Sequence, residues 1–177
     1  MIIIKMVIYM YYLKNFLLYS VIGFILETIA YLCLHNGGSS GILFGPWTPV
    51  YGIGILIILL NYNWINKYNL SKIKKILFLF LSNMIILSII ELIGGYVIEL
   101  VFSTVYWNYR NMKFHIGNYI SLEISIIWGL LSLVYIYLLK PISDKIIKRV
   151  PNYIPYIISI LFTLDLIITI IIKINLN

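Results

Sequence analysis

The chain has 177 residues, of which 62% are hydrophobic and 11% are charged, and its mean hydropathy is +1.00. A soluble domain averages about 45–50% apolar and about 25% charged residues, so this composition excludes a soluble fold and predicts an integral membrane protein. The formal net charge of +7 is expected to reflect membrane topology and attraction to anionic lipid, and no nucleic-acid partner is predicted.

Polar residues divide the chain into five apolar stretches, and roughly 20 apolar residues are enough to span the hydrocarbon of a bilayer. The pattern predicts an all-α, polytopic membrane protein that forms a single integral membrane domain over residues 1–177. The five predicted spans cover about residues 16–34, 51–64, 76–101, 120–139 and 154–172. The tyrosine-rich opening, residues 1–12, is predicted as an interfacial segment that leads into an uncleaved first span.

The first connection, residues 37–54, has the sequence "GGSSGILFGPWTPVYGIG" and carries no charge. Pro46 and Pro49 prevent a continuous helix here, and glycines such as Gly45 permit close approach of the backbone. Only about 14 apolar residues follow, which favours a partly re-entrant outer loop that leads into a short or tilted helix. The alternative is an ordinary turn in which Trp47 is an interfacial anchor.

The third span contains the stretch "IELIGGYVIEL", in which Glu91 and Glu99 flank Gly94 and Gly95. A spacing of eight residues places the two carboxylates on one broad face of a helix, about 12 Å apart along its axis. The glycine pair is expected to let a neighbouring backbone approach closely, or to let the helix bend.

The connection between the third and fourth spans is rich in aromatic and basic residues. Trp107 and Tyr109 resemble an interfacial aromatic belt, and Arg110 lies beside them. His35 and His115 both fall in predicted outer segments, but no paired spacing such as H-x-x-x-H accompanies them. Neither a metal site nor a cofactor is therefore expected.

Basic residues are distributed unevenly among the connections. The amino-terminal segment, the second connection and the fourth connection carry ten Lys and Arg residues, whereas the first connection, the third connection and the tail carry three. The positive-inside rule then predicts a cytoplasmic amino terminus and an outer carboxyl terminus.

Acidic residues follow the opposite pattern, because five of the six fall inside predicted spans and only Asp144 lies in a connection. A charge at the bilayer centre costs about 2.5–3.5 kcal/mol on insertion scales, so such residues normally face a bundle interior or water. The predicted orientation places all five in the outer half of the bilayer, which favours one outward-facing acidic site for a polar or cationic substrate. The predicted site residues are Glu27, Glu91, Glu99, Glu123, Asp165, Gly45, Pro46, Trp107, Tyr109 and Arg110. The alternative is structural: the acids hold helices together, with Glu99 and Glu123 paired to Arg110 and Lys113.

The ordered series "GILFGPWTPVYGIG", "ELIGGYVIEL", "YWNY" and "FHIGNYISLEISIIWGLL", with Pro141 after the fourth span, resembles a known bacterial family. This is the family of putative ABC-transporter type IV, or CmpB-like, permeases, and the likeness covers about residues 16–142. It implies a multi-pass, permease-like protein of the bacterial cytoplasmic membrane and fixes no substrate. The chain departs from the family pattern at Trp47–Thr48, at Asn108 and in "GNYISLE". The span at 154–172 lies beyond the resemblance.

An ABC permease works with an ATPase, and no G-x-x-x-x-G-K-[ST] motif occurs in this chain. Any ATPase would therefore be a separate subunit, docked on a cytoplasmic helix for which the basic segments at 66–75 and 140–155 are the candidates. The other predicted partners are membrane lipids and a homo-oligomeric or hetero-complex assembly. The alternative for these segments is contact with anionic lipid alone. Two other function classes stay open: an accessory or sensory membrane protein, and a membrane-embedded enzyme acting on lipid, for which no nucleophile and base are evident.

Overall fold

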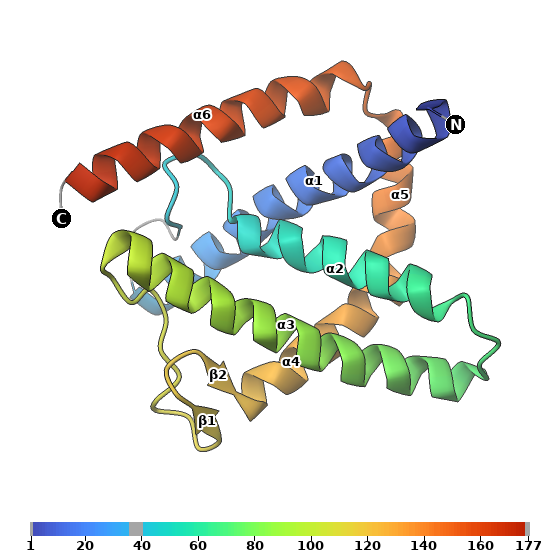
Figure 1. The fold of residues 1–177 in the computed structure, drawn as a ribbon, viewed down its shortest axis with the longest axis horizontal. Helices are drawn as coiled ribbons and strands as arrows, with labels where there is room; N and C mark the ends of the chain where they lie inside the picture. Colours follow the sequence, from blue (N-terminus) through green and yellow to red (C-terminus); the bar gives the residue numbers. More distant parts are fainter. Residues whose placement is uncertain (1, 36–40, 176–177) are drawn as a thin grey trace. The chain divides into compact units, whose positions relative to one another are not determined.

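The computed structural model describes residues 2–35 and 41–175 and is almost entirely helical (Figure 1). The helices, with one π-helical turn named η1, are α1 (Ile2–His35), α2 (Pro49–Ile65), α3 (Lys72–Phe102), α4 (Leu122–Val134), η1 (Tyr135–Leu139), α5 (Lys140–Arg149) and α6 (Tyr153–Asn175). The strands are β1 (His115–Ile116) and β2 (Ile120–Ser121). The prediction of an all-α polytopic protein is confirmed.

Four helical segments are long and apolar enough to cross a membrane, namely Met6–Cys33, Lys72–Phe102, Leu122–Arg149 and Tyr153–Ile174. The fifth predicted span corresponds to α2, which is a shorter apolar helix of 17 residues. The short length of α2 agrees with the prediction that prolines in the first connection prevent a continuous helix and shorten the second span. These helices place the protein in a membrane.

The residues divide into two compact units, and each is described by itself. Unit 1 contains residues 1–56 and 143–176, and unit 2 contains residues 57–142. Unit 1 therefore holds α1, the first turns of α2, most of α5 and α6. Unit 2 holds the rest of α2, α3, the β1–β2 hairpin, α4 and η1.

Helix boundaries follow local chemistry. Pro49 occupies the first position of α2, where a missing N–H costs no helical bond. Ser103 ends α3 in the left-handed conformation at φ 50°. Ser121 caps α4 by accepting a bond of 3.2 Å from the Ile124 amide.

Two helices extend beyond the predicted spans. Residues 2–12, predicted as an interfacial lead-in, form one continuous helix with the first span, because their apolar side chains extend the helical pattern without a helix breaker. Residues 140–149 are helical as α5, reached through the wide turn η1, in which the Lys140 amide bonds to the carbonyl of Tyr135. The ring of Pro141 blocks regular α-helical bonding at this point, which accounts for the wider turn.

The core of unit 2 contains polar side chains that join three helices. Asn61 on α2 donates to Asn83 on α3 at 2.8 Å, and Asn83 donates to Ser132 on α4 at 3.1 Å. Asn83 and Ser132 are fully buried. In an apolar environment each unpaired amide would be costly, so these bonds fix the register of the helices.

Candidate functional site

The non-helical segment that follows α1, residues 41–48, is fastened to the middle of α6 by one carboxylate. Asp165 Oδ2 accepts from the Gly45 amide at 2.9 Å and from the Trp47 indole N–H at 2.8 Å. The Trp47 ring also meets the ring of Phe162 edge to face at 5.9 Å. Asp165 lies at the middle of a 22-residue apolar span, so this loop is held at mid-span depth in unit 1.

The same loop is bonded to the middle of α1. The Thr48 amide donates to the Ser20 carbonyl at 2.9 Å, and the Thr48 hydroxyl donates to Glu27 Oε2 at 3.4 Å. Ser20 lies halfway along the 28-residue span Met6–Cys33, about 20 Å from its end at Cys33. The loop therefore re-enters the span, and α2 begins at this depth. Figure 1 shows the segment before α2 running beside α6.

Small residues make this re-entry sterically possible. A Cβ on Gly45 would overlap the indole of Trp47 and lie 3.0 Å from Asp165 Oδ2. A Cβ on Gly52 would meet the backbone carbonyl oxygen of Phe16 at 2.6 Å, so glycine allows the backbone of α2 to approach the backbone of α1 closely.

In unit 2 the carboxylate of Glu91 is buried and accepts two bonds from neutral donors. The Tyr109 hydroxyl donates to Oε1 at 2.6 Å, and the Trp128 indole N–H donates to Oε2 at 2.9 Å. Glu91 is 8% exposed. Both carboxylate oxygens are therefore used, one to hold the connection between α3 and α4 and the other to hold α4 itself against α3.

Glu99, which lies eight residues after Glu91 on α3, also accepts a hydrogen bond from an aromatic side chain. Tyr119 donates to Glu99 Oε2 at 2.8 Å, and its ring packs edge to face against Tyr96 and Trp107. Burial raises the pKa of Tyr119 above its ordinary value of 10.0, and the bond and charge of Glu99 add to the rise. The phenol stays protonated and acts as the donor.

Gly95 provides the space that Tyr119 occupies. A Cβ on Gly95 would lie 2.5 Å from Tyr119 Cγ, whereas nothing lies within 4 Å of a Cβ on Gly94. The close approach expected at this glycine pair is therefore that of an aromatic ring at Gly95 alone, and α3 continues without interruption from Lys72 to Phe102.

Three further charged residues of unit 2, namely Glu123, Arg110 and Lys113, lie in and around the hairpin. Glu123 accepts from the Phe114 amide at 3.2 Å, and Arg110 donates to Asn118 at 2.5 Å. Lys113 lies 5.4 Å from the centroid of the Phe114 ring. The structure thus gives Arg110 and Lys113 partners other than the acids with which the structural alternative paired them.

The predicted site residues fall into two groups, one in each unit. Unit 1 brings together Glu27, Gly45 and Asp165 around the loop, with Pro46 in the same segment. Unit 2 brings Glu91 to Tyr109, and Glu99 and Trp107 to opposite sides of Tyr119. Arg110 and Glu123 belong to unit 2 as well, at the hairpin.

Sequence reasoning missed several donors at these carboxylates. Thr48 and Trp47 were recognisable only as departures from a family pattern, and they supply bonds to Glu27 and Asp165. Tyr119 carried no signal beyond its aromatic character, because its role depends on the hairpin that folds it back over Gly95. Trp128 lies 37 residues from Glu91 and is brought to it by the packing of α4 on α3.

The chemistry available at these groups is binding of a polar or cationic species by carboxylates, together with hydrogen bonding by phenol, indole and hydroxyl groups. Among the described residues, no group of three or more His, Cys, Asp or Glu side chains is placed to hold a metal ion. The side chain of His35 lies outside the described residues.

Comparison with known proteins gives one match. The model of the family described as putative ABC-transporter type IV matches residues 14–174, a range that includes α6. Neither a curated protein nor a solved structure matches the chain. Because the match covers most of the sequence, the chain belongs to the family of putative ABC-transporter type IV membrane proteins.

Proposed function

We propose that this protein is the membrane-spanning permease component of a transporter, with a polar or cationic substrate bound at the carboxylates of unit 1. The observation that carries the proposal is the re-entrant loop 41–48, bonded at mid-span depth to Ser20 and Asp165. Family membership supports an ABC-transporter-related role in general terms.

Non-helical backbone inside a membrane is tolerated only where protein buries it or where it lines a water-filled cavity. Transporters use this arrangement at their substrate sites, because an interrupted helix leaves polar backbone groups available at mid-depth. A purely structural bundle has no need to interrupt its second span. The position of the break in this chain therefore favours a transport role.

The charge of the loop's surroundings favours a cationic or polar solute. Glu27 and Asp165 both contact the loop, and their bonding partners here are a hydroxyl, an indole and an amide. With the amino terminus in the cytoplasm, as the basic residues predict, the loop opens toward the outer face of a bacterial cytoplasmic membrane. In this proposal Glu91, Glu99 and Glu123 hold the outer connection in place.

A second candidate is an accessory or sensory membrane protein. The observation that favours it is that Tyr109 and Trp128 each donate a hydrogen bond to one carboxylate oxygen of Glu91. This acid therefore has a structural role rather than a role in transport. An accessory protein would bind a partner through its outer connection and would move no solute.

The test begins with the tagged full-length chain, purified from its native membrane in mild detergent and analysed by quantitative mass spectrometry. The proposal predicts a stoichiometric ATPase subunit. The purified assembly is then placed in lipid vesicles, and uptake of Na⁺, K⁺, Mg²⁺ and spermidine is measured with ATP.

The proposal also predicts flux of at least one of these cations and a loss of at least tenfold in Glu27→Gln. Glu123→Gln is the matched control, since it removes an acid bonded to the hairpin rather than to the loop. A lone homo-oligomer without flux would contradict the permease role and support the accessory one.

A further inference from the structure

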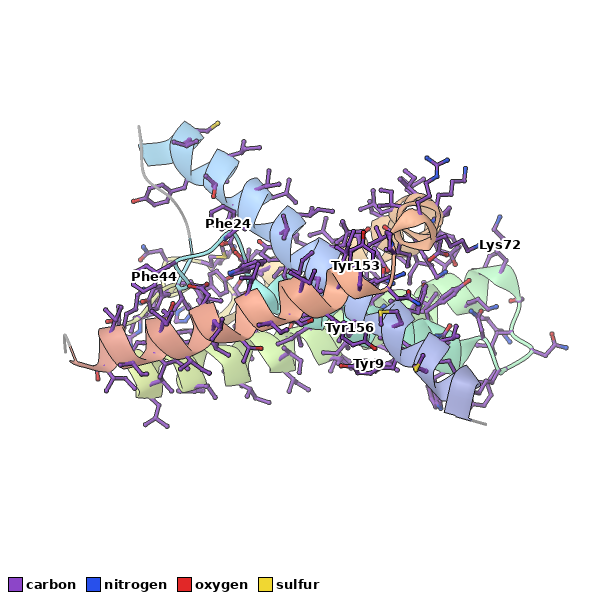
Figure 2. All side chains as sticks on the ribbon, turned by 90° about the horizontal axis from the view of Figure 1, so that it is seen from above. Tyr9, Phe24, Phe44, Lys72, Tyr153 and Tyr156 are labelled. Atoms are coloured by element: carbon purple, nitrogen blue, oxygen red, sulfur yellow. The ribbon has the colours of Figure 1, made fainter. Side chains whose placement is uncertain are left out.

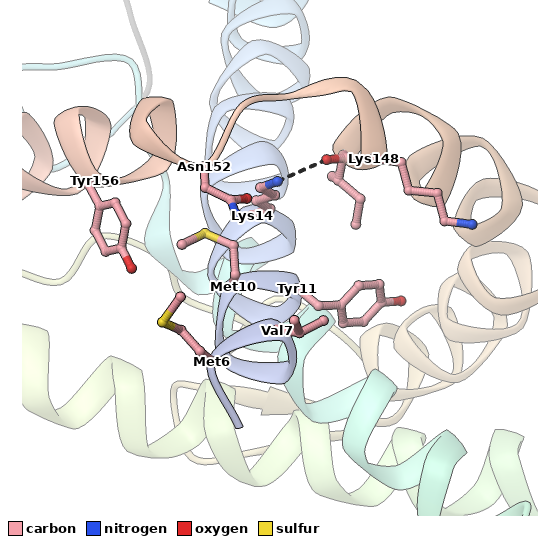
Figure 3. A pocket seen from close by; sticks show the side chains of 9 residues that line it. Met6, Val7, Met10, Tyr11, Lys14, Lys148, Asn152 and Tyr156 are labelled. Carbon is pink, nitrogen blue, oxygen red and sulfur yellow. Dashed lines mark hydrogen bonds between the residues drawn. The ribbon is translucent and has the colours of Figure 1, made fainter. Parts of the chain in front are cut away.

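Unit 1 contains a cavity of about 300 Å³. It is formed by the start of α1, the end of α5 and the start of α6. Figure 3 shows its lining, with Met6, Met10 and Lys14 projecting from α1 and Tyr156 facing them from α6. None of the site residues predicted from the sequence lines this cavity.

The polar part of the lining is basic. Lys14 and Lys148 both contribute, and the nine lining residues include no Asp or Glu. Lys14 donates to the carbonyls of Ile147 at 3.2 Å and Val150 at 2.7 Å, which caps the end of α5. An ammonium group has three donors, so one N–H of Lys14 is left to bind an anion. Lys148 is exposed and lies on α5, next to Ile147, whose carbonyl accepts one of the bonds of Lys14.

The rest of the lining is apolar and flexible. Met6 and Val7 are 56% and 64% exposed, while Met10 is almost fully buried. Unbranched methionine side chains adapt to irregular chains of methylene groups. The cavity therefore combines an anion-binding edge with a surface that fits hydrocarbon.

Tyrosines place the cavity at the depth of lipid headgroups. Figure 2 shows Tyr9 on the first turns of α1, and Tyr153 and Tyr156 on the first turns of α6. All three are exposed, at 59%, 64% and 45%. Tyrosine concentrates at membrane interfaces because its ring is apolar and its hydroxyl is polar. Basic pockets between membrane helices at this depth suit anionic headgroups.

We propose that this cavity binds one anionic phospholipid, with its phosphate at Lys14 and Lys148 and an acyl chain along Met6, Val7 and Met10. The lipid adds a link between the ends of α1, α5 and α6, where Lys14 and the bond from Tyr11 to Asp144 already join α1 to α5. Charge complementarity and the apolar lining together distinguish this occupant from a free phosphate compound, which would use only the basic edge.

The test uses the purified full-length chain and native mass spectrometry, titrated with phosphatidylglycerol, phosphatidylcholine or glycerol 3-phosphate. We expect the first phosphatidylglycerol to bind at least tenfold more tightly than phosphatidylcholine, and glycerol 3-phosphate to bind at least a hundredfold more weakly. Lys148→Gln should weaken phosphatidylglycerol binding about fivefold, because one lysine near an anionic lipid contributes about that factor. Met6→Trp should weaken it further by filling the cavity mouth.

Two matched controls separate a site from diffuse attraction. Lys145→Gln removes another exposed lysine of α5, and Ile8→Trp enlarges another exposed side chain of α1, and neither residue lines the cavity. Both controls should bind as the unmodified chain does. Equal weakening in Lys145→Gln and Lys148→Gln would overturn the proposal, as would equal binding of the two lipids. Binding of glycerol 3-phosphate as tight as that of phosphatidylglycerol would overturn the assignment to lipid.

Discussion

Replacing Gly95 with alanine should destabilise unit 2, because the added Cβ would lie 2.5 Å from Tyr119 Cγ. Carbon atoms in ordinary contact lie about 3.5–4.0 Å apart, so the ring must move by roughly 1 Å. Tyr119 is 1% exposed and has little free space to move into. A shift of that size takes its hydroxyl, now 2.8 Å from Glu99, out of hydrogen-bonding range.

The magnitude follows from three contributions. Overpacking a filled site costs about 1–3 kcal/mol, and losing a hydrogen bond to a charged group costs about 1.5–3 kcal/mol. Alanine in place of glycine within a helix returns about 0.5–1 kcal/mol. The net expectation for Gly95→Ala is a destabilisation of about 2–5 kcal/mol.

Gly94→Ala provides the matched control, because nothing lies within 4 Å of its added Cβ. It should stabilise the protein by about 0.5–1 kcal/mol through helix propensity alone. Both variants are measured by reversible denaturant unfolding in detergent micelles. If the two variants have equal stability, or if Gly95→Ala is the more stable, then Tyr119 does not occupy this position and the reasoning is refuted.

Three further predictions concern other polar contacts. A double-mutant cycle of Glu91→Gln and Tyr109→Phe should give a coupling free energy of about 0.5–2 kcal/mol in unfolding experiments, and additive effects would show that the two side chains do not interact. Asn83→Leu should destabilise the protein by about 1–3 kcal/mol, because it removes the buried bonds that join α3 to Asn61 and Ser132 on two other helices; a melting temperature at or above that of the unmodified chain would contradict this. Gly45→Ala should release the loop from Asp165, which limited proteolysis between α1 and α2 detects as faster cleavage, whereas an unchanged cleavage rate would argue against the close packing.

Much of the fold is predictable from composition, because a chain this apolar has few alternatives to membrane-spanning helices. The shortened second span follows from Pro46 and Pro49, which break any helix through the first connection. Residues 140–155 were a candidate cytoplasmic helix, but the direct continuation of α4 into α5 through η1 was not predicted, because the apolar pattern ends at Leu139.

The site was partly predictable for a similar reason. A carboxylate in an apolar span must find partners, so Glu91 and Asp165 stood out from the sequence. Which partners they find depends on tertiary packing: Trp128 comes from a different helix, and Gly45 from a loop 120 residues away from Asp165. Spacing along one helix carries no information about such pairs.

The re-entrant loop is the central feature of this account, and the accessibility of Thr48 tests it most directly. Cys33 is the single cysteine of the chain, so Cys33→Ser provides a background for Thr48→Cys. Only a hydrated thiol ionises and reacts with a membrane-impermeant thiol reagent.

We predict that intact cells expressing Thr48→Cys are labelled from outside at a rate within tenfold of that of native Cys33, which is exposed near the end of the first span. Leu26→Cys, which replaces an exposed apolar residue of the same helix, should stay unlabelled in the lipid. Labelling of Thr48→Cys only after detergent treatment, as for Leu26→Cys, would contradict a water-accessible loop at mid-span depth.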